Sequence, residues 1–186
     1  MPSNITSAIA FIVNALTSLY LLVLLLRFWL PWLRADFRNP LAQGILKLTS
    51  PIVVPLRRVV PSFGRLDTAT VALAFIIQYL TILLLLLILS ASATFADIAI
   101  TACVKLIALS INLFAYAIFI RIILSWIAPG QHSPGTAIIT ALTEPVLRPF
   151  RRIIPPLGGF DISPLFAVIL LFALTIVVNG FKPLGI

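Results

Sequence analysis

Two arginines and two aspartates lie at the ends of apolar segments, where a charged side chain needs a partner of opposite charge or a polar environment. Arg27 and Arg121 each lie near the end of a long apolar run, and Asp67 and Asp161 each lie just before the next run. A partly buried charge is costly unless it is matched, so we expect Arg27 to pair with Asp67 and Arg121 with Asp161. Two alternatives stay open: each arginine reaches the lipid headgroups, or Arg27 pairs with Asp161.

Two basic clusters lie between these charged residues. Arg57 and Arg58 form one, and Arg148, Arg151 and Arg152 form the other. A basic residue beside anionic lipid contributes about 1 kcal/mol to binding. We interpret both clusters as contacts for anionic lipid or a protein partner, with a simple role in setting membrane orientation as the alternative.

The chain shows no motif of a catalytic site. It has no Gly-rich phosphate loop, no His–Glu metal motif, and no Ser or Cys nucleophile beside a base. Its single cysteine, Cys103, and single histidine, His132, cannot build a disulfide framework or a conventional zinc or haem site in one chain. We therefore expect no enzymatic activity, no cofactor and no metal.

The charged residues belong to a duplicated segment, because residues 27–67 align without a gap to residues 121–161. Such self-similarity indicates a repeated structural unit. Fourteen positions are identical: Arg27, Leu30, Trp32, Pro40, Ile45, Leu48, Thr49, Pro51, Pro55, Arg57, Arg58, Pro61, Gly64 and Asp67 recur as Arg121, Leu124, Trp126, Pro134, Ile139, Leu142, Thr143, Pro145, Pro149, Arg151, Arg152, Pro155, Gly158 and Asp161.

The composition places the repeats in a membrane. Of 186 residues 61% are hydrophobic and 10% are charged, against about 25% charged in soluble domains. Four runs are long enough to span a bilayer: about 8–26, 69–89, 101–120 and 165–181. The fold class we expect is an all-α membrane protein of four transmembrane helices. They form two parallel tandem repeats, 1–93 and 94–186, each a span, an amphipathic loop and a second span.

The distribution of basic residues sets the expected orientation. Nine of the 13 Lys and Arg residues lie in the two repeated loops, and such loops face the cytoplasm. We therefore expect both loops to be cytoplasmic and both termini to face the opposite side of the membrane. Trp29, Trp32 and Trp126 would be anchors at the cytoplasmic interface.

Each loop carries the pattern of a helix lying on the membrane surface. In the first loop the apolar positions are Leu41, Ile45, Leu48, Ile52, Leu56, Val59 and Phe63. In the second they are Ile139, Leu142, Val146, Phe150, Ile153 and Leu157. This spacing fits one helix face, with basic residues on the opposite face of the first loop.

Prolines and glycines punctuate the loops. Asn39 and Ser133, each followed by proline, predict helix starts. Pro51 and Pro145 should break each helix into two short helices. Pro55 and Pro149 would lie in the first turns of the second helix, and Pro61 and Pro155 would end it. Gly64 and Gly158 would turn the chain back to the bilayer. A helix cap at the start of the next span is the alternative role for Asp67 and Asp161. In the second copy Ser163-Pro164 offers a competing cap, which would free Asp161 for another role.

The segments from Thr49 to Asp67 and from Glu144 to Pro164 resemble the signature of the YggT family, in its two-copy proteobacterial form. The first copy departs where Arg65 matches Gly159 and where Ala69-Thr70 matches Ser163-Pro164. The resemblance implies an integral protein of the bacterial cytoplasmic (inner) membrane, in which the outward-facing termini would be periplasmic. Relatives are associated with cell division, envelope organisation, osmotic or potassium-linked phenotypes, and, in plastids, nucleoid distribution and cytochrome assembly.

Two functions remain open at this point. The first is a non-enzymatic organiser or assembly factor that binds anionic lipid and an unknown membrane or cytoplasmic protein through its basic loops; a homo-oligomer is possible, and nucleic acid is not an expected partner. The second is a small oligomeric channel or ion-transport component. If the protein is a channel, Asn14, Gln78, Asn112 and Asn179 should line one cavity. If it is an organiser, these side chains should form hydrogen bonds between helices.

Overall fold

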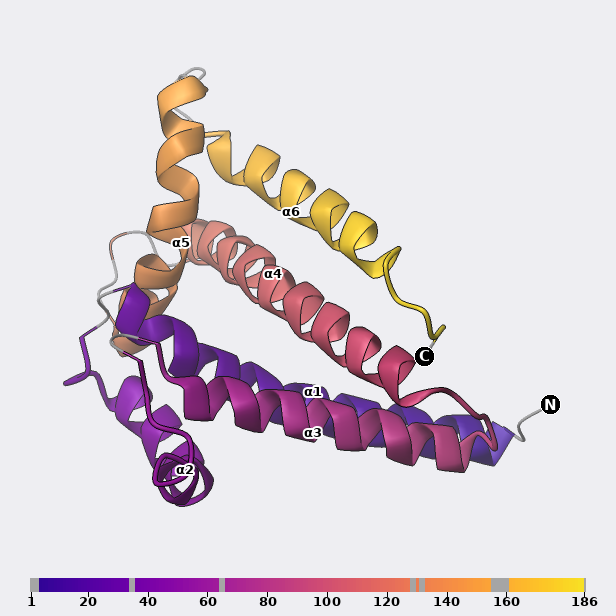
Figure 1. The fold of residues 1–186 in the computed structure, drawn as a ribbon. Coiled ribbons are helices and arrows are strands. Elements are labelled where there is room, and N and C mark those ends of the chain that lie inside the picture. Colours follow the sequence, from indigo (N-terminus) through magenta and orange to yellow (C-terminus); the bar gives the residue numbers. More distant parts are fainter. Residues whose placement is uncertain are drawn as a thin grey trace.

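The computed structural model describes residues 4–33, 36–63, 66–127, 130, 133–154 and 161–185. These residues form six α-helices (Figure 1), so the expected all-helical class is confirmed. The helices are α1 (Asn4–Trp32), α2 (Pro40–Leu56), α3 (Thr68–Ile88), α4 (Phe95–Ile127), α5 (Pro134–Ile153) and α6 (Ser163–Asn179).

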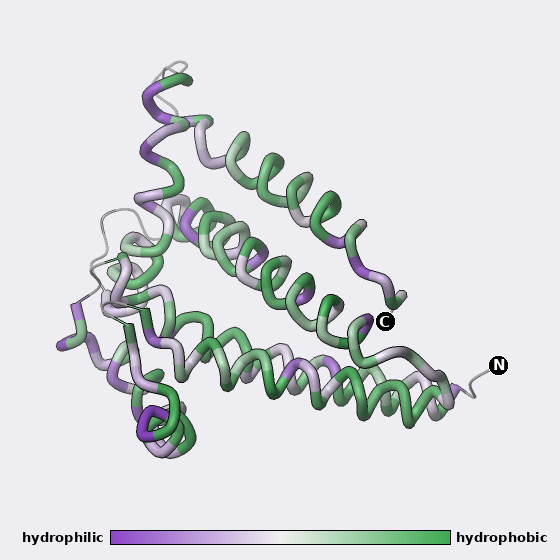
Figure 2. Tube along the Cα trace, in the orientation of Figure 1, coloured by the Kyte–Doolittle hydropathy of each residue, from purple (hydrophilic) through white to green (hydrophobic). Residues whose placement is uncertain are grey.

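Three of these helices, α1, α3 and α4, are long and apolar enough to cross a membrane. Figure 2 shows hydrophobic residues along most of their length, with hydrophilic residues gathered on α2 and α5. The chain is thus a membrane protein. The fourth expected span, α6, is apolar but has 17 residues. At about 1.5 Å per residue it is about 26 Å long, slightly less than the roughly 30 Å of hydrocarbon in a bilayer.

The long helices pack as two neighbouring pairs. Helix α1 lies against α3, α4 lies against α6, and α4 also contacts α3 and α1. Figure 1 shows α2 and α5 at one end of these helices and both chain termini at the other. The starts of α2 and α5 meet there, where the side chain of Asn39 donates a hydrogen bond of 2.7 Å to the carbonyl of Pro134.

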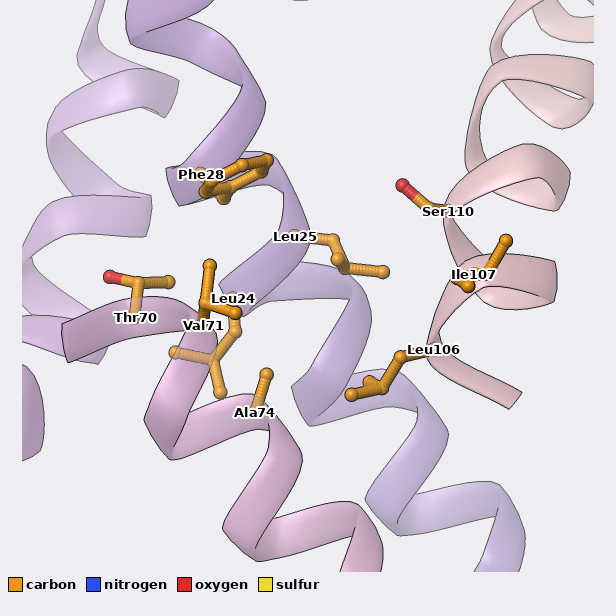
Figure 3. A pocket seen from close by; sticks show the side chains of 9 residues that line it. All are labelled: Leu24, Leu25, Phe28, Thr70, Val71, Ala74, Leu106, Ile107 and Ser110. Carbon is orange, nitrogen blue, oxygen red and sulfur yellow. The ribbon is translucent and has the colours of Figure 1, made fainter. Parts of the chain in front are cut away.

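An apolar cleft separates α4 from the α1–α3 pair over part of their length. It has a volume of about 190 Å³, and its lining includes Leu25 and Phe28 of α1, Val71 of α3 and Ile107 of α4 (Figure 3). Beyond this cleft Trp29 joins the two pairs, because its Nε1 donates to Ser110 Oγ at 2.7 Å and its ring packs edge-on against Phe114. Trp29 therefore links α1 to α4. This contact was not part of its expected role as an interfacial anchor.

Each loop folds as one helix, so the prediction of two short helices per loop is wrong. Pro51 and Pro55 lie inside α2, and Pro145 and Pro149 lie inside α5. Each proline removes one backbone donor, yet the helices continue because contacts hold both sides of the break. In α2, Ala42 and Thr49 before Pro51 and Val53 after it are all buried against the spans.

The helix starts are as the sequence predicts. Asn39 caps α2 and Ser133 caps α5, each with proline in the first turn, and Asp67 caps α3 by accepting a hydrogen bond from the backbone N–H of Thr70. Asp161 differs, because the position before α6 is Ile162. Its carboxylate accepts instead from the backbone N–H of Ser163 at 3.0 Å. The end of α2 also differs from the prediction, because this helix ends at Leu56 and not at Pro61.

The apolar stripes of the two loop helices face different surroundings. In α2 the side chains of Leu41, Leu48 and Ile52 are exposed, with 67% of Leu48 accessible. In α5 the equivalent of Leu48, Leu142, is 2% exposed. It belongs to a buried cluster shared with Leu30 of α1 and Ala42 of α2. Helix α5 thus packs into the protein through its stripe, whereas α2 packs through Ala42 and Val53 and leaves Leu41, Leu48 and Ile52 exposed.

Candidate functional site

Arg27 is the most buried charged side chain of the predicted sites, with 4% of its surface accessible. It extends from α1 to α2, where its Nη1 donates to Thr49 Oγ1 at 2.7 Å and to Ser50 Oγ at 3.0 Å. The carbonyl of Leu46 lies at 3.5 Å. A buried guanidinium needs such acceptors, so these contacts fasten the middle of α2 to the end of α1.

Asp67 provides the negative charge of this cluster. One carboxylate oxygen lies 3.6 Å from Arg27 Nε. The same carboxylate accepts two hydrogen bonds from Arg57, at 3.2 and 2.6 Å, and one from the Thr70 hydroxyl at 2.6 Å. The structure therefore brings Arg27 and Asp67 together as predicted from the sequence. It adds Arg57, which binds Asp67 in the two-pronged geometry that strengthens an arginine–carboxylate pair.

These contacts change the acidity of Asp67. Burial alone would raise its pKa, but hydrogen bonds from Arg57 and Thr70 and the charge of Arg57 outweigh burial and hold the pKa below its ordinary value. The hydrogen bond to Asp67 in turn raises the pKa of Arg57. Asp67 therefore stays ionised at neutral pH and balances part of the charge of two arginines.

The second copy builds a similar cluster with different partners, so the predicted pair of Arg121 with Asp161 is wrong. Arg121 Nη1 donates to Thr143 Oγ1 at 2.7 Å and forms an ion pair with Glu144 at 3.0 Å. Arg151 bridges Glu144, at 3.1 Å, and Asp161, at 2.8 Å. Glu144 occupies the position equivalent to Ser50 and supplies a nearer carboxylate, which explains why Arg121 does not need Asp161.

The acids of this second cluster are more accessible than Asp67. The side chain of Asp161 is 40% exposed and that of Glu144 is 36%, against 11% for Asp67. Burial raises the pKa of both acids, but hydrogen bonds from Arg151 to Asp161 and from Arg121 to Glu144 hold both pKa values below the ordinary range. Water screens this cluster more than the first.

The other predicted residues lie in different surroundings. Arg58, Arg148 and Arg152 are exposed, and no ion pair involving them is found within the described part of the chain. Arg57 and Arg151, predicted as lipid or partner contacts, are used in the clusters above. The carbonyl of Pro61 accepts a hydrogen bond from Thr68. Gly64, Pro155 and Gly158 lie outside the described residues.

Thr49 and Thr143 were not predicted from the sequence as partners of the arginines. Each hydroxyl also donates back to the carbonyl four residues earlier, at 2.6 and 2.7 Å. Their role was nevertheless predictable, because a threonine recurs at this position in both segments, where the helix packs against the protein. Glu144 carried no such signal, since its equivalent is Ser50.

Two pairs of polar side chains form hydrogen bonds between the apolar helices. Lys105 Nζ donates to Asn14 at 3.1 Å, and the Thr175 hydroxyl donates to Asn112 at 3.0 Å. Of the four residues that a channel requires in one cavity, Gln78, Asn112 and Asn179 share one, and Asn14 is not part of its described lining. Among the residues that the structure describes, no three side chains of His, Cys, Asp or Glu lie close enough to share a metal ion.

We expect removal of the Asp67 charge to be far more damaging than removal of the Asp161 charge. Breaking a buried pair from one side costs about 3–5 kcal/mol, whereas an exposed pair contributes about 0–1 kcal/mol. Asp67→Asn should therefore lower the unfolding temperature strongly and Asp161→Asn only slightly, as measured by thermal unfolding of the full chain in detergent. Asparagine still caps a helix, so the comparison isolates the charge. Equal losses in the two variants would contradict this assignment.

The pH dependence of stability should carry the signature of Asp67. Because its folded-state pKa lies below that of an unfolded aspartate, about 3.9, its pairing stabilises the fold above that value. The contribution is lost as the pH falls through the folded-state pKa. The gap in unfolding temperature between the wild type and Asp67→Asn should therefore be constant near neutral pH and narrow below about pH 4. A gap that does not change with pH would show that the charge of Asp67 is not what stabilises the cluster.

Comparison with known proteins places these features in a family. The family model described as CCB3/YggT matches residues 6–88 and again residues 100–181. A protein of Pseudomonas aeruginosa described as uncharacterised is 40% identical over 170 residues, which cover 90% of this chain and 86% of that protein. The YggT protein of Escherichia coli K12, also described as uncharacterised, is 35% identical over 169 residues, 90% of this chain and 87% of that protein.

A plant relative matches a shorter part. The protein described as chloroplastic YlmG homolog protein 2 of Arabidopsis thaliana is 35% identical over 65 residues, which cover 35% of this chain and 26% of that protein. No solved structure matches this chain. The family model covers most of the chain in two matches, and the bacterial relatives align over nearly its whole length. The chain belongs to the CCB3/YggT family.

Proposed function

We propose that this chain is a non-enzymatic organiser or assembly factor of the bacterial inner membrane, acting through α2 and α5 on the cytoplasmic surface. In this proposal α6 is the fourth span, residues 1–93 and 94–186 are parallel tandem repeats, and both termini are periplasmic. The two matches of one family model support the repeats. The equivalent contacts of Arg27 with Thr49 and of Arg121 with Thr143 support them further.

The exposed outer face of α2 is the main support for this proposal. The ion pair of Arg57 with Asp67 and the burial of Ala42 and Val53 hold α2 to the protein from one side. On the other side Leu48 and Ile52 remain exposed. A helix with a free apolar stripe beside basic residues has the character of an interfacial helix, and an apolar stripe exposed to water alone would be unfavourable.

Three exposed basic residues at or near the ends of α2 and α5 are suited to anionic lipid. Arg58 follows the end of α2, and Arg148 and Arg152 lie in the last two turns of α5. All three are exposed. Arg57 and Arg151 serve the internal clusters instead, so this proposal assigns lipid contact to Arg58, Arg148 and Arg152. The concentration of the repeated identities in the loops also favours a role for these helices beyond linking the spans.

A small oligomeric channel remains the alternative, because Gln78, Asn112 and Asn179 do line one cavity. Two features of that cavity weigh against a path for potassium or another cation. Lys105 and Lys182 also line it, and no carboxylate is found among the described residues of its lining. Positive charge repels a cation, and a ring of acidic side chains or carbonyls is what cation channels use.

We expect the triple variant Arg58→Ala/Arg148→Ala/Arg152→Ala to lose its preference for anionic lipid. Each arginine contributes about 1 kcal/mol, so the enrichment of phosphatidylglycerol around the protein in mixed nanodiscs should fall by about tenfold or more. Lipid that remains with the purified full chain can be quantified by mass spectrometry. The matched Arg→Lys triple variant keeps the charge and should keep the enrichment. Unchanged enrichment in the alanine variant would remove lipid binding from the proposal.

The organiser role predicts a protein neighbour on the exposed stripe of α2. A photo-crosslinking residue placed at Leu48 should capture a protein of defined mass in native membranes, because this side chain is exposed. The same residue at Leu142, the buried equivalent in α5, is the matched control and should capture no second protein. Crosslinks from Leu48 to lipid alone would contradict the organiser role and leave the lipid contact standing.

A further inference from the structure

A polar cavity lies between the spans and is distinct from the charged clusters at α2 and α5. It has a volume of about 150 Å³ and draws its polar lining from four helices and the C-terminal segment: Ser18 of α1, Gln78 of α3, Lys105 and Asn112 of α4, Asn179 of α6, and Lys182. The space admits several water molecules or one small polyatomic ion. Figure 1 shows the end of α6 and the C-terminus on the side of the bundle away from α2 and α5.

The described side chains that line this cavity carry positive charge, and none of them is an acid. Lys105 Nζ donates to Asn14 Oδ1 at 3.1 Å, but an ammonium group has three donors. No ion pair of Lys105 or Lys182 is found within the described residues. Asp97, the one acidic side chain on α4, accepts a hydrogen bond from Thr94. A charge among apolar helices is costly without a counter-charge, so the cavity favours an anion.

The neutral side chains add hydrogen-bond donors to this charge. Gln78 is 3% exposed, and its Nε2 has no hydrogen-bond partner in the described part of the chain. Buried amide donors are rarely left without a partner in native proteins. Asn112 accepts from Thr175 through its Oδ1, which leaves its amide group to donate into the cavity. The lining therefore combines two ammonium groups with side-chain amides from α3, α4 and α6.

We propose that this cavity binds a phosphate group, supplied either by a phospholipid headgroup or by free inorganic phosphate. Lysine is a common ligand of phosphate, and hydrogen bonds between charged partners are stronger than neutral ones. The several oxygens of phosphate can accept from donors on different helices at once, which a single-atom anion does less well. The bound group would satisfy Gln78 and balance Lys105, and it would link α1, α3, α4 and α6.

The test uses the purified full chain in a maltoside detergent without phosphate. Either sodium phosphate or a short-chain phosphatidylglycerol is titrated, with sodium chloride at matched ionic strength as the reference, and thermal unfolding reports binding, since a ligand of the native state raises the unfolding temperature. Stabilisation by both probes identifies the phosphate group itself as the ligand. Stabilisation by the lipid alone identifies a headgroup site.

Variants assign the effect to the cavity. Lys105→Gln and Gln78→Met should each weaken binding about tenfold or more, as expected for a lost hydrogen bond to a charged group. Lys47→Gln, on the exposed face of α2, removes the same charge elsewhere and should bind as the wild type does. The second variant keeps the test valid if Lys105→Gln does not fold. No stabilisation of the wild type by either probe, or equal stabilisation of Gln78→Met, would overturn the proposal.

Discussion

A guanidinium group buried among apolar helices needs hydrogen-bond acceptors, and Arg27 has them on α2, which is not one of the three long apolar helices. Its contacts with Thr49 and Ser50 fix the middle of α2 against the end of α1. Asp67 then draws Arg57 from the end of α2 and also begins α3. The position of the surface helix and the start of the next span therefore depend on one charged cluster.

The two halves of the chain use this cluster to different degrees. In the first half the acid is Asp67, which is largely buried, and α2 exposes its apolar stripe. In the second half Glu144 and Asp161 share Arg151 in a more accessible cluster, and α5 turns its stripe toward α1, α4 and α6. The two charged clusters are thus similar, but the helix of the first half exposes Leu48 whereas the helix of the second half buries the equivalent Leu142.

The features that follow local rules were predictable from the sequence. Apolar runs predicted the long helices, and Asn39, Ser133 and Asp67 began helices because their side chains accept backbone hydrogen bonds. Features that depend on competition between partners were not predictable in the same way. Pro51 does not break α2, since packing and the contacts of Arg27 hold both sides. Arg121 takes Glu144 because that acid lies nearer than Asp161 once α5 has folded, and spacing in the sequence does not reveal this distance.

If Arg27 holds α2 to the long apolar helices, loss of its guanidinium should loosen α2. Hydrogen exchange of backbone amides, measured in nanodiscs for the wild type and for Arg27→Met, tests this directly, because exchange reports local opening of individual helices. We expect faster exchange along α2 in the variant, with α5 unchanged as an internal reference. Unchanged protection of α2 in Arg27→Met would show that Arg27 does not hold this helix in place.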